Sequence, residues 1–344
     1  MSAIASERML RTNALRRFLI RPETGAVAGS IAVWIFFAIV AGSSGFVTIL
    51  ATSSYLSVSA ELAILAVPVA LLMIGGEFDL SVGATVGASS MVIAILTTQL
   101  GFNVWLAILA SVVFAVLIGL MNGYLVMRTR LPSFIVTLGT AYILQGLTAG
   151  LTVRLTGLTV VNGVDKAPGF SSAHAIFATP LGGGQLFPVE LLWALALVVL
   201  ATWLLLGTAF GNWIFGVGGD ANAARNIGVP VTRVKILLFI GTALGACLLG
   251  IIQTMTFTNA DVERGLGQEF VAIVAAVVGG VLLTGGYGSA IGAMFGALAF
   301  GMVEQGIVLA GVDANWYKLV IGVILLLAVL LNSYVRKLAM EARR

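Results

Sequence analysis

Residues 61–98 read ELAILAVPVALLMIGGEFDLSVGATVGASSMVIAILTT, which is two apolar runs joined by a short polar break. Each run, 61–76 and 81–98, approaches the ~20 residues with which a helix crosses the hydrocarbon layer of a bilayer. The first run is short and ends in Gly75-Gly76, and short, glycine-interrupted spans are typical of broken helices that line a transport site. The stretch therefore predicts membrane-spanning helices around a polar site.

The composition of the whole chain favours the same class of protein. Of its 344 residues, 60% are hydrophobic and 9% are charged, and the mean hydropathy is +1.10. Soluble domains carry roughly 25% charged residues, because water must wet their surface. The single cysteine excludes a disulfide framework, and the single histidine excludes a multi-histidine metal site. We expect no metal and no cofactor.

We predict an all-α integral membrane protein with about ten transmembrane helices, some of them short or broken. Run 270–284 is short and is followed by Gly285-Gly286. The remaining apolar runs are a first helix that begins at 26, and 103–127, 134–151, 189–208, 236–258, 288–311 and 316–335.

The positive charges predict the orientation. If the N-terminus is cytoplasmic, all but four of the 18 Lys and Arg residues fall on the cytoplasmic side, as the positive-inside rule requires. An even number of spans then places both termini in the cytoplasm. The four external residues are Arg154, Lys166, Arg264 and Lys318.

Polarity divides the chain into three parts. Residues 1–25 form a basic cytoplasmic segment, 26–335 the transmembrane domain, and 336–344 a cytoplasmic tail. Two long non-membrane stretches interrupt the transmembrane domain. They are an external loop, 152–188, and a cytoplasmic loop, 209–235.

The polar break at 75–83 carries the first candidates for a translocation route, which are Glu77, Asp79 and Ser81. Placing a charge at the bilayer centre costs at least ~2.5–3.5 kcal/mol, so a carboxylate at this depth indicates a functional or structural role. The carboxylate of Asp79 has a second interpretation, as a cap for the helix that starts near Ser81. Both roles can hold together.

Glu304 and Gln305 interrupt the apolar helix 288–311. A carboxylic acid at this depth must face the bundle interior, a partner or water. The alternatives are a role in the route or its gating, and a buried structural hydrogen bond.

Glycines at a spacing of four predict helix faces on which two backbones approach closely. They occur in 81–98 and 288–311, and they are Gly83, Gly87, Gly288, Gly292 and Gly296.

The cytoplasmic loop predicts a short helix from Asp220 to Ile227. Asp220 is a suitable N-cap, and Gly228 with Pro230 supplies the stop. From the residues alone, the helix is either a loop element at the lipid headgroups or a docking element for a cytoplasmic partner.

Over nearly its whole length the chain resembles the permeases of bacterial ATP-binding-cassette (ABC) importers of the ribose, xylose, arabinose and galactose type. Four segments carry the resemblance, in order along the chain. They are GGEFDLSVG at 75–83, LPSFIVTLGT at 131–140, GGDANAARNIG at 218–228, and the glycine-rich 275–296 with Gly279-Gly280, Gly285-Gly286 and Gly288-Ser289.

The resemblance implies a permease subunit of the bacterial plasma (inner) membrane, which forms the pathway for a monosaccharide or related small polar solute. ATP hydrolysis is then expected in a separate subunit, and no G-x-x-x-x-G-K-[ST] motif occurs in this chain. The implied partners are a cytoplasmic ATPase, a periplasmic or extracellular solute-binding protein, a second permease subunit (identical or related) and membrane lipid. The basic residues form no patch with aromatics, so nucleic acid is not expected.

The resemblance also implies that the short cytoplasmic helix couples the chain to the ATPase, and it adds Phe134 and Thr137 as pathway candidates. Asn222 stands where the family commonly has Glu, and Glu304-Gln305 where related chains often have amides. The coupling residues would be Gly219, Asp220, Asn222, Ala223, Ala224, Arg225 and Gly228.

A second hypothesis is an ion-coupled secondary transporter of small solutes, in which Asp79 and Glu304 bind protons. A third, a membrane enzyme, lacks a plausible catalytic constellation in the sequence.

Overall fold

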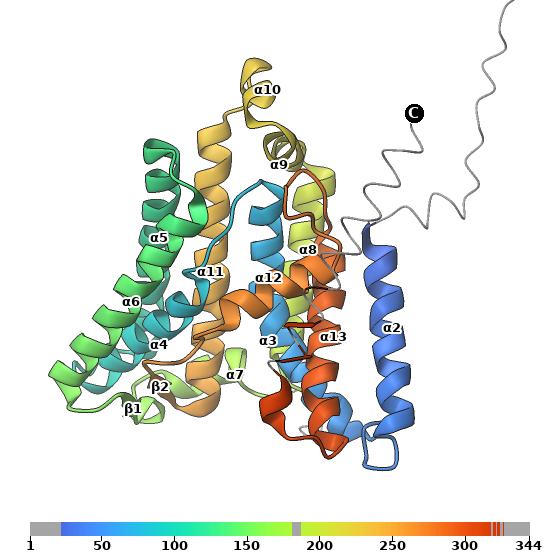
Figure 1. The fold of residues 1–344 in the computed structure, drawn as a ribbon. Helices are drawn as coiled ribbons and strands as arrows, with labels where there is room; N and C mark the ends of the chain where they lie inside the picture. The colour runs from blue at the N-terminus through green and yellow to red at the C-terminus, as the bar shows by residue number, and fades with distance from the viewer. Residues whose placement is uncertain (1–21, 181–186, 318, 321, 324–325, 327–344) are drawn as a thin grey trace, which may run out of the picture.

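A computed structural model describes residues 22–180, 187–317, 319–320, 322–323 and 326. Within these residues the chain forms twelve α-helices, and the long ones stand side by side in one bundle (Figure 1). The predicted tail 336–344, and most of segments 1–25 and 316–335, lie outside the described residues. The helices are α2 (Pro22–Val40), α3 (Ile49–Ile74), α4 (Val82–Thr98), α5 (Val104–Thr129), α6 (Ser133–Thr156), α7 (Phe170–Phe177), α8 (Glu190–Gly207), α9 (Ala209–Gly219), α10 (Ala221–Asn226), α11 (Val231–Phe257), α12 (Gln268–Val278) and α13 (Ala290–Leu309).

Seven of the described helices are long and apolar enough to cross a bilayer, and they are α2, α3, α5, α6, α8, α11 and α13. Two more, α4 and α12, are apolar but shorter. The predicted class, a helical protein that crosses the membrane several times, is therefore confirmed. The count of ten stays a prediction, because the last expected span, 316–335, lies mostly outside the described residues.

Helix α3 corrects one expectation. Run 61–76 is not a short span, because α3 is continuous over 26 residues and begins where the side chain of Thr48 accepts a hydrogen bond from Ala51 N. Its first turns are rich in Ser and Thr, which lowers their hydropathy. Those hydroxyls bond to the carbonyl four residues earlier, as Ser59 Oγ does to Tyr55 O at 2.6 Å. The short helices are instead α4, with 17 residues, and α12, with 11.

Two long helices, α3 and α11, form the buried centre of the bundle. They approach closely where Gly245 of α11 meets α3, since a Cβ there would lie 2.8 Å from Pro68 Cγ. Helices α2, α6 and α8 are mostly exposed and carry large apolar side chains outward. This distribution suits a core of small residues inside an apolar belt that lipid covers.

A two-stranded antiparallel ladder joins two distant loops at one end of the bundle (Figure 1). Strand β1 (Val160–Asn162) pairs with β2 (Asn259–Asp261), and Val160 is opposite Asp261. Helix α7 lies in the same region, and α6 extends to Thr156. The expected external loop 152–188 is thus partly structured, and its first residues belong to α6.

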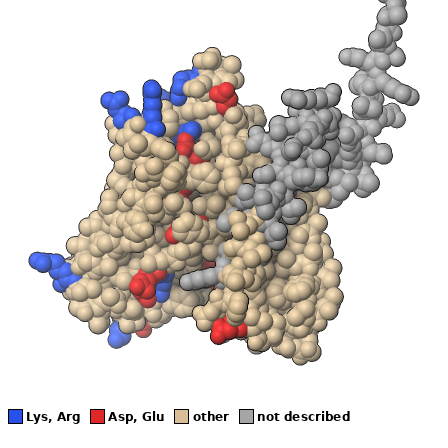
Figure 2. Space-filling view, viewed as in Figure 1, with Lys and Arg blue, Asp and Glu red and all other residues tan. Residues whose placement is uncertain are grey.

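The two ends of the bundle differ in charge (Figure 2). We call them the α10 end and the ladder end. Between the two ends, the face in this view is mostly uncharged, with scattered acidic atoms. Of the described basic residues, those at the α10 end are Arg128, Arg130, Arg225, Arg233 and Lys235, and those at the ladder end are Arg154, Lys166 and Arg264. The α10 end is therefore the more basic of the two within the described residues, and the positive-inside rule favours it as the cytoplasmic end.

Candidate functional site

The carboxylate of Asp79 lies inside the protein, between α3 and α4. Its Oδ1 accepts hydrogen bonds from Ser81 N at 2.9 Å and Ser81 Oγ at 2.6 Å. Its Oδ2 accepts one from Thr242 Oγ1 of α11, at 2.6 Å. The side chain is 1% exposed. Asp79 therefore supports the start of α4, where Ser81 is the N-cap residue, and ties that start to α11.

The network continues from Ser81 into two further helices. Asn122 of α5 donates from Nδ2 to Ser81 Oγ at 2.9 Å, and Thr140 Oγ1 of α6 donates to Asn122 Oδ1 at 2.7 Å. All of these side chains are buried. The sequence analysis did not identify Asn122, Thr140 and Thr242, because a polar residue within an apolar run does not show which neighbouring helix it faces.

Helix α6 also holds the backbone of the polar break. Ser133 Oγ accepts from Phe78 N, and Thr137 Oγ1 accepts from Leu80 N, both at 3.0 Å. Thr137 is buried, whereas Phe134 is half exposed on the outside of the bundle. Of the two pathway candidates in this segment, only Thr137 contacts the break.

Glu77 forms an ion pair with Lys235 of α11, and both side chains are largely buried. The pair lies near the α10 end, because α3 ends and α11 begins there. The contact joins the polar break to α11 a second time. Lys235 is a partner that the sequence interpretation did not identify.

A separate group of polar side chains surrounds the middle of α3, and we call it the α3 polar cluster. Gln253 Nε2 of α11 donates to Glu61 Oε2 at 2.7 Å, and Ser57 Oγ donates to Glu190 Oε1 at 2.9 Å. Glu190 and Glu304 both act electrostatically on Glu61. The cluster consists of Ser57, Glu61, Glu190, Gln253 and Glu304.

Glu304 thus faces the interior, where it also hydrogen-bonds with Tyr317, and Gln305 beside it is partly exposed. Arg264 approaches the cluster from the loop between α11 and α12 and donates to Asn259 O at 2.6 Å. Burial lowers the pKa of its guanidinium, and the carboxylates of Asp261 and Glu61 raise it. A guanidinium keeps its charge in proteins, so Arg264 is a cation beside the carboxyl groups of Asp261 and Glu61.

At the α10 end, Asp220 is the N-cap that the sequence predicts. Its Oδ1 accepts from Asn222 N at 2.8 Å and from Ala223 N at 3.0 Å, and Gly228 has a φ of +90° after the helix. Helix α10 projects from the bundle (Figure 1). Ala224 is 3% exposed and Ile227 is 83% exposed, so the helix presents a large apolar side chain outward.

Within the predicted cytoplasmic loop 209–235, residues Ala209–Gly219 form helix α9, which the sequence analysis did not identify. The end of α9 contacts two other segments through bare backbone. A Cβ at Gly218 would lie 1.7 Å from Ile74 O, and one at Gly285 would lie 2.9 Å from Gly76 Cα. Gly286 N also donates to Ile74 O at 2.8 Å. We call this meeting of Gly76, Gly218, Gly219, Gly285 and Gly286 the glycine junction.

The glycines expected at helix contacts lie in two places. A Cβ at Gly292 or Gly296 would lie 2.0 Å from a carbonyl oxygen of the α12 segment, Gly279 O or Ala275 O. Gly83 faces Glu269 Oε2 and Gly265 O, and Gly87 faces Arg264 O. Helix α13 begins at Ala290 with Ser289 as N-cap, so Gly288 precedes the helix instead of sharing its face.

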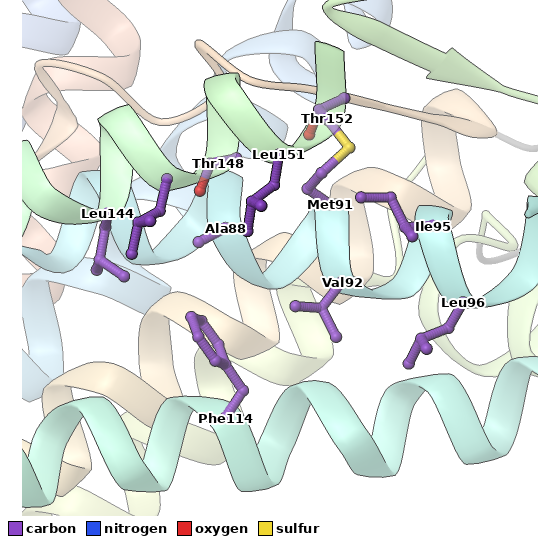
Figure 3. A pocket seen from close by; sticks show the side chains of 11 residues that line it. Ala88, Met91, Val92, Ile95, Leu96, Phe114, Leu144, Thr148, Leu151 and Thr152 are labelled. Carbon is purple, nitrogen blue, oxygen red and sulfur yellow. The ribbon is translucent and has the colours of Figure 1, made fainter. Parts of the chain in front are cut away.

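The cavities of the bundle lie apart from these polar groups. One of about 260 Å³ is lined by apolar side chains of α4, α5 and α6, such as Met91, Phe114 and Leu144 (Figure 3). Another of about 320 Å³ between α3, α8 and α11 is also apolar. Neither suits a polar solute. No group of three or more His, Cys, Asp or Glu side chains in the described residues is placed to hold a metal ion.

Comparison with known proteins gives a family match and several relatives. A family model described as "Branched-chain amino acid transport system / permease component" matches residues 51–329. The ribose import permease protein RbsC of Escherichia coli (strain K12) is 32% identical over 320 residues, which is 92% of this chain and 97% of that protein. No solved structure matches.

Two further relatives cover somewhat less of the chain. The fructose import permease protein FrcC of Rhizobium meliloti is 32% identical over 278 residues, 78% of this chain and 74% of its own length. The autoinducer 2 import system permease protein LsrC of Enterobacter sp. (strain 638) is 31% identical over 277 residues, 80% of this chain and 77% of its own.

Proposed function

The chain belongs to the family described as the permease component of branched-chain amino acid transport systems, and from this membership we propose its function. It is the membrane-spanning permease subunit of an ABC importer for a monosaccharide or related small polar solute. The observation that carries the proposal is the match to a ribose import permease over 92% of the chain. It is a multi-pass protein of the bacterial inner membrane.

The proposed energy source rests on two observations: the chain has no phosphate-binding loop, and its relatives are import permeases. None of its four lysines is preceded by glycine, so the phosphate-binding loop of P-loop ATPases does not occur in it. We therefore place ATP hydrolysis in a separate cytoplasmic subunit. A second permease subunit and an external solute-binding protein complete the proposed importer.

Helix α10 is the proposed contact with the ATPase subunit. It lies at the more basic end, its N-cap is satisfied, and Ile227 beside it is exposed. Large apolar side chains that project into a partner carry much of the binding energy in protein interfaces. Ala224 packs inward, so the residues that we expect to touch the ATPase are Asn222, Ala223, Arg225 and Ile227.

We expect Ile227→Asp to abolish co-purification of the chain with its ATPase while leaving the chain itself folded, because the side chain contacts solvent in the free subunit. Pull-down from detergent after co-expression measures assembly, and size-exclusion chromatography measures folding. The matched control is Ile176→Asp, an exposed isoleucine at the ladder end. Normal assembly of the Ile227 variant would overturn the role of α10.

The function itself is tested with the complete importer in proteoliposomes. We expect uptake of D-ribose or D-fructose that requires ATP inside the vesicles and the solute-binding protein outside them. Uptake that needs neither but follows a proton gradient would favour the secondary transporter instead. In that alternative, Asp79 would have to release hydrogen bonds to α4 and α11 in every cycle.

A further inference from the structure

The α3 polar cluster lies at the depth where a transported solute binds. Glu61 is the 13th of the 26 residues of α3, which places it at the middle of a helix that spans the bundle. Transporters hold their substrates near the bilayer midplane, where sparse polar groups face an otherwise apolar interior. Glu61 is partly exposed.

Gln253 supplies an independent sign of a missing ligand. Its Nε2 donates to Glu61 Oε2, and its side chain is only 6% exposed. Its Oε1 is buried and has no hydrogen-bond partner among the described residues. A buried acceptor without a partner costs free energy, and such groups in folded proteins normally find a protein donor, a water or a ligand. The carbonyl of Gln253 is therefore open to a hydrogen-bond donor that the described residues do not provide.

The surroundings of the pair select the kind of donor. Glu190 and Glu304 lie close enough to act electrostatically on Glu61, and Arg264 adds one positive charge. Three carboxylates against one guanidinium repel an anionic solute. Hydroxyl groups can donate to a carboxylate and to an amide carbonyl at once, without bringing a charge into the bundle.

We propose that Glu61 and Gln253 form the solute-binding pair of the translocation pathway, and that they accept hydrogen bonds from neighbouring hydroxyls of a neutral, polyhydroxylated solute. This inference rests on the proposed function and adds the residues that contact the solute. Ser57 positions Glu190 at the edge of the site through its 2.9 Å hydrogen bond.

The test uses the complete importer in proteoliposomes with Glu61→Gln and Gln253→Leu. For each variant we measure D-ribose moved per ATP hydrolysed, and ATP hydrolysis stimulated by the loaded binding protein. We expect ribose moved per ATP to fall about tenfold, as for the loss of one hydrogen bond to a charged group. The rate of ATP hydrolysis stimulated by the loaded binding protein should stay within about twofold of the rate with the natural chain, because the contact with the ATPase is intact. The matched control is Glu263→Gln, an exposed carboxylate of the ladder end.

Deoxy analogues separate a solute contact from a structural role. One deoxy analogue of ribose lacks the hydroxyl that donates to Gln253. The natural chain should move this analogue about tenfold less well than ribose, since a site built to bind a hydroxyl rejects the analogue without it. Gln253→Leu should move the two sugars equally. If the variants lower the transport of ribose and of its deoxy analogue by the same factor, the two residues have a structural role and the inference is overturned.

The remaining outcomes distinguish this inference from the function on which it rests. If the natural chain moves ribose or fructose with ATP and both variants do so equally well, the binding pair is wrong and the importer stands. If the natural chain moves none of D-ribose, D-fructose and ribitol, or moves L-leucine instead, the proposed function fails and the hydroxyl site fails with it.

Discussion

Asp79 illustrates how a charged residue is retained inside a membrane protein. Its two oxygens accept three hydrogen bonds, from Ser81 and Thr242, and it is buried. A buried carboxylate is tolerated when donors surround it. In this chain those donors belong to the start of α4 and to α11, so the acid joins two helices that the sequence separates by more than 130 residues.

We predict that Asp79→Ala lowers the free energy of unfolding by about 2 kcal/mol or more, because it leaves the buried N–H and Oγ–H donors of Ser81 without their acceptor. Thr242→Val should cost less, since it removes a single donor. Thermal unfolding in detergent, followed by size-exclusion chromatography, measures both. Asp313→Asn is the control, because Asp313 is exposed. Equal stability of the Ala variant and the natural chain would contradict the role of Asp79 in holding α4.

Helix α9 connects α10 to the end of α3 and to the segment before α13 partly through direct backbone contacts. Its last residues touch the end of α3 and the segment before α13 through backbone atoms at the glycine junction. A contact made of backbone has no rotamers with which to absorb displacement. A movement of α10 that an ATPase imposes should therefore reach α3 and α13 directly.

Two substitutions in α9 test that connection. Gly218→Ala places a Cβ 1.7 Å from Ile74 O, so the segments must separate, and we expect a large loss of ATP-driven uptake. Gly216→Ala is the matched control, because no atom lies within 4 Å of its Cβ. It should be neutral or stabilise by up to about 1 kcal/mol, the usual gain of alanine over glycine in a helix. Equal uptake by the two variants would show that the glycine junction accommodates a Cβ at Gly218 and that its close backbone contact is not needed for transport.

Elements with a strong local signal were predictable from the sequence, and elements that depend on distant contacts were not. The runs 81–98, 103–127, 189–208 and 288–311 and the cap at Asp220 correspond to helices near their expected bounds, whereas α3 begins at Ile49, well before the run 61–76. Helix α9 was missed because its four glycines give it low helix propensity, and packing against α8 and α11 stabilises it instead. Strands β1 and β2 have three residues each, too few to show a periodic pattern.

The polar site was predictable only in part, for the same reason. Asp79, Ser81, Thr137 and Glu304 stand out because they are polar groups beside or within apolar runs. Their partners come from helices far along the chain, and the choice of partner depends on how those helices cross. Glu61 and Gln253 are a further case, since nothing in the sequence of either helix shows that they meet where α3 and α11 cross.

At the scale of the whole molecule, the charge difference between the two ends predicts a fixed orientation in the membrane. Cys247 is the only cysteine and is 1% exposed, so the natural chain should not react with a membrane-impermeant maleimide. Ile227→Cys should react only from the cytoplasmic side, and Asp165→Cys only from the outside. Labelling of intact cells against inverted vesicles measures both. Reaction of the two variants from the same side would contradict the crossing of the bilayer between them.

The ladder also sets an order on the synthesis of the protein. Val160 pairs with Asp261, so β1 leaves the ribosome about a hundred residues before its partner. At 5–20 residues per second that interval is about 5 to 20 seconds. During it β1 must remain unpaired while α7 to α11 are still being made. The nascent chain thus carries an open strand edge, which can close only after β2, the strand that follows α11, has been made.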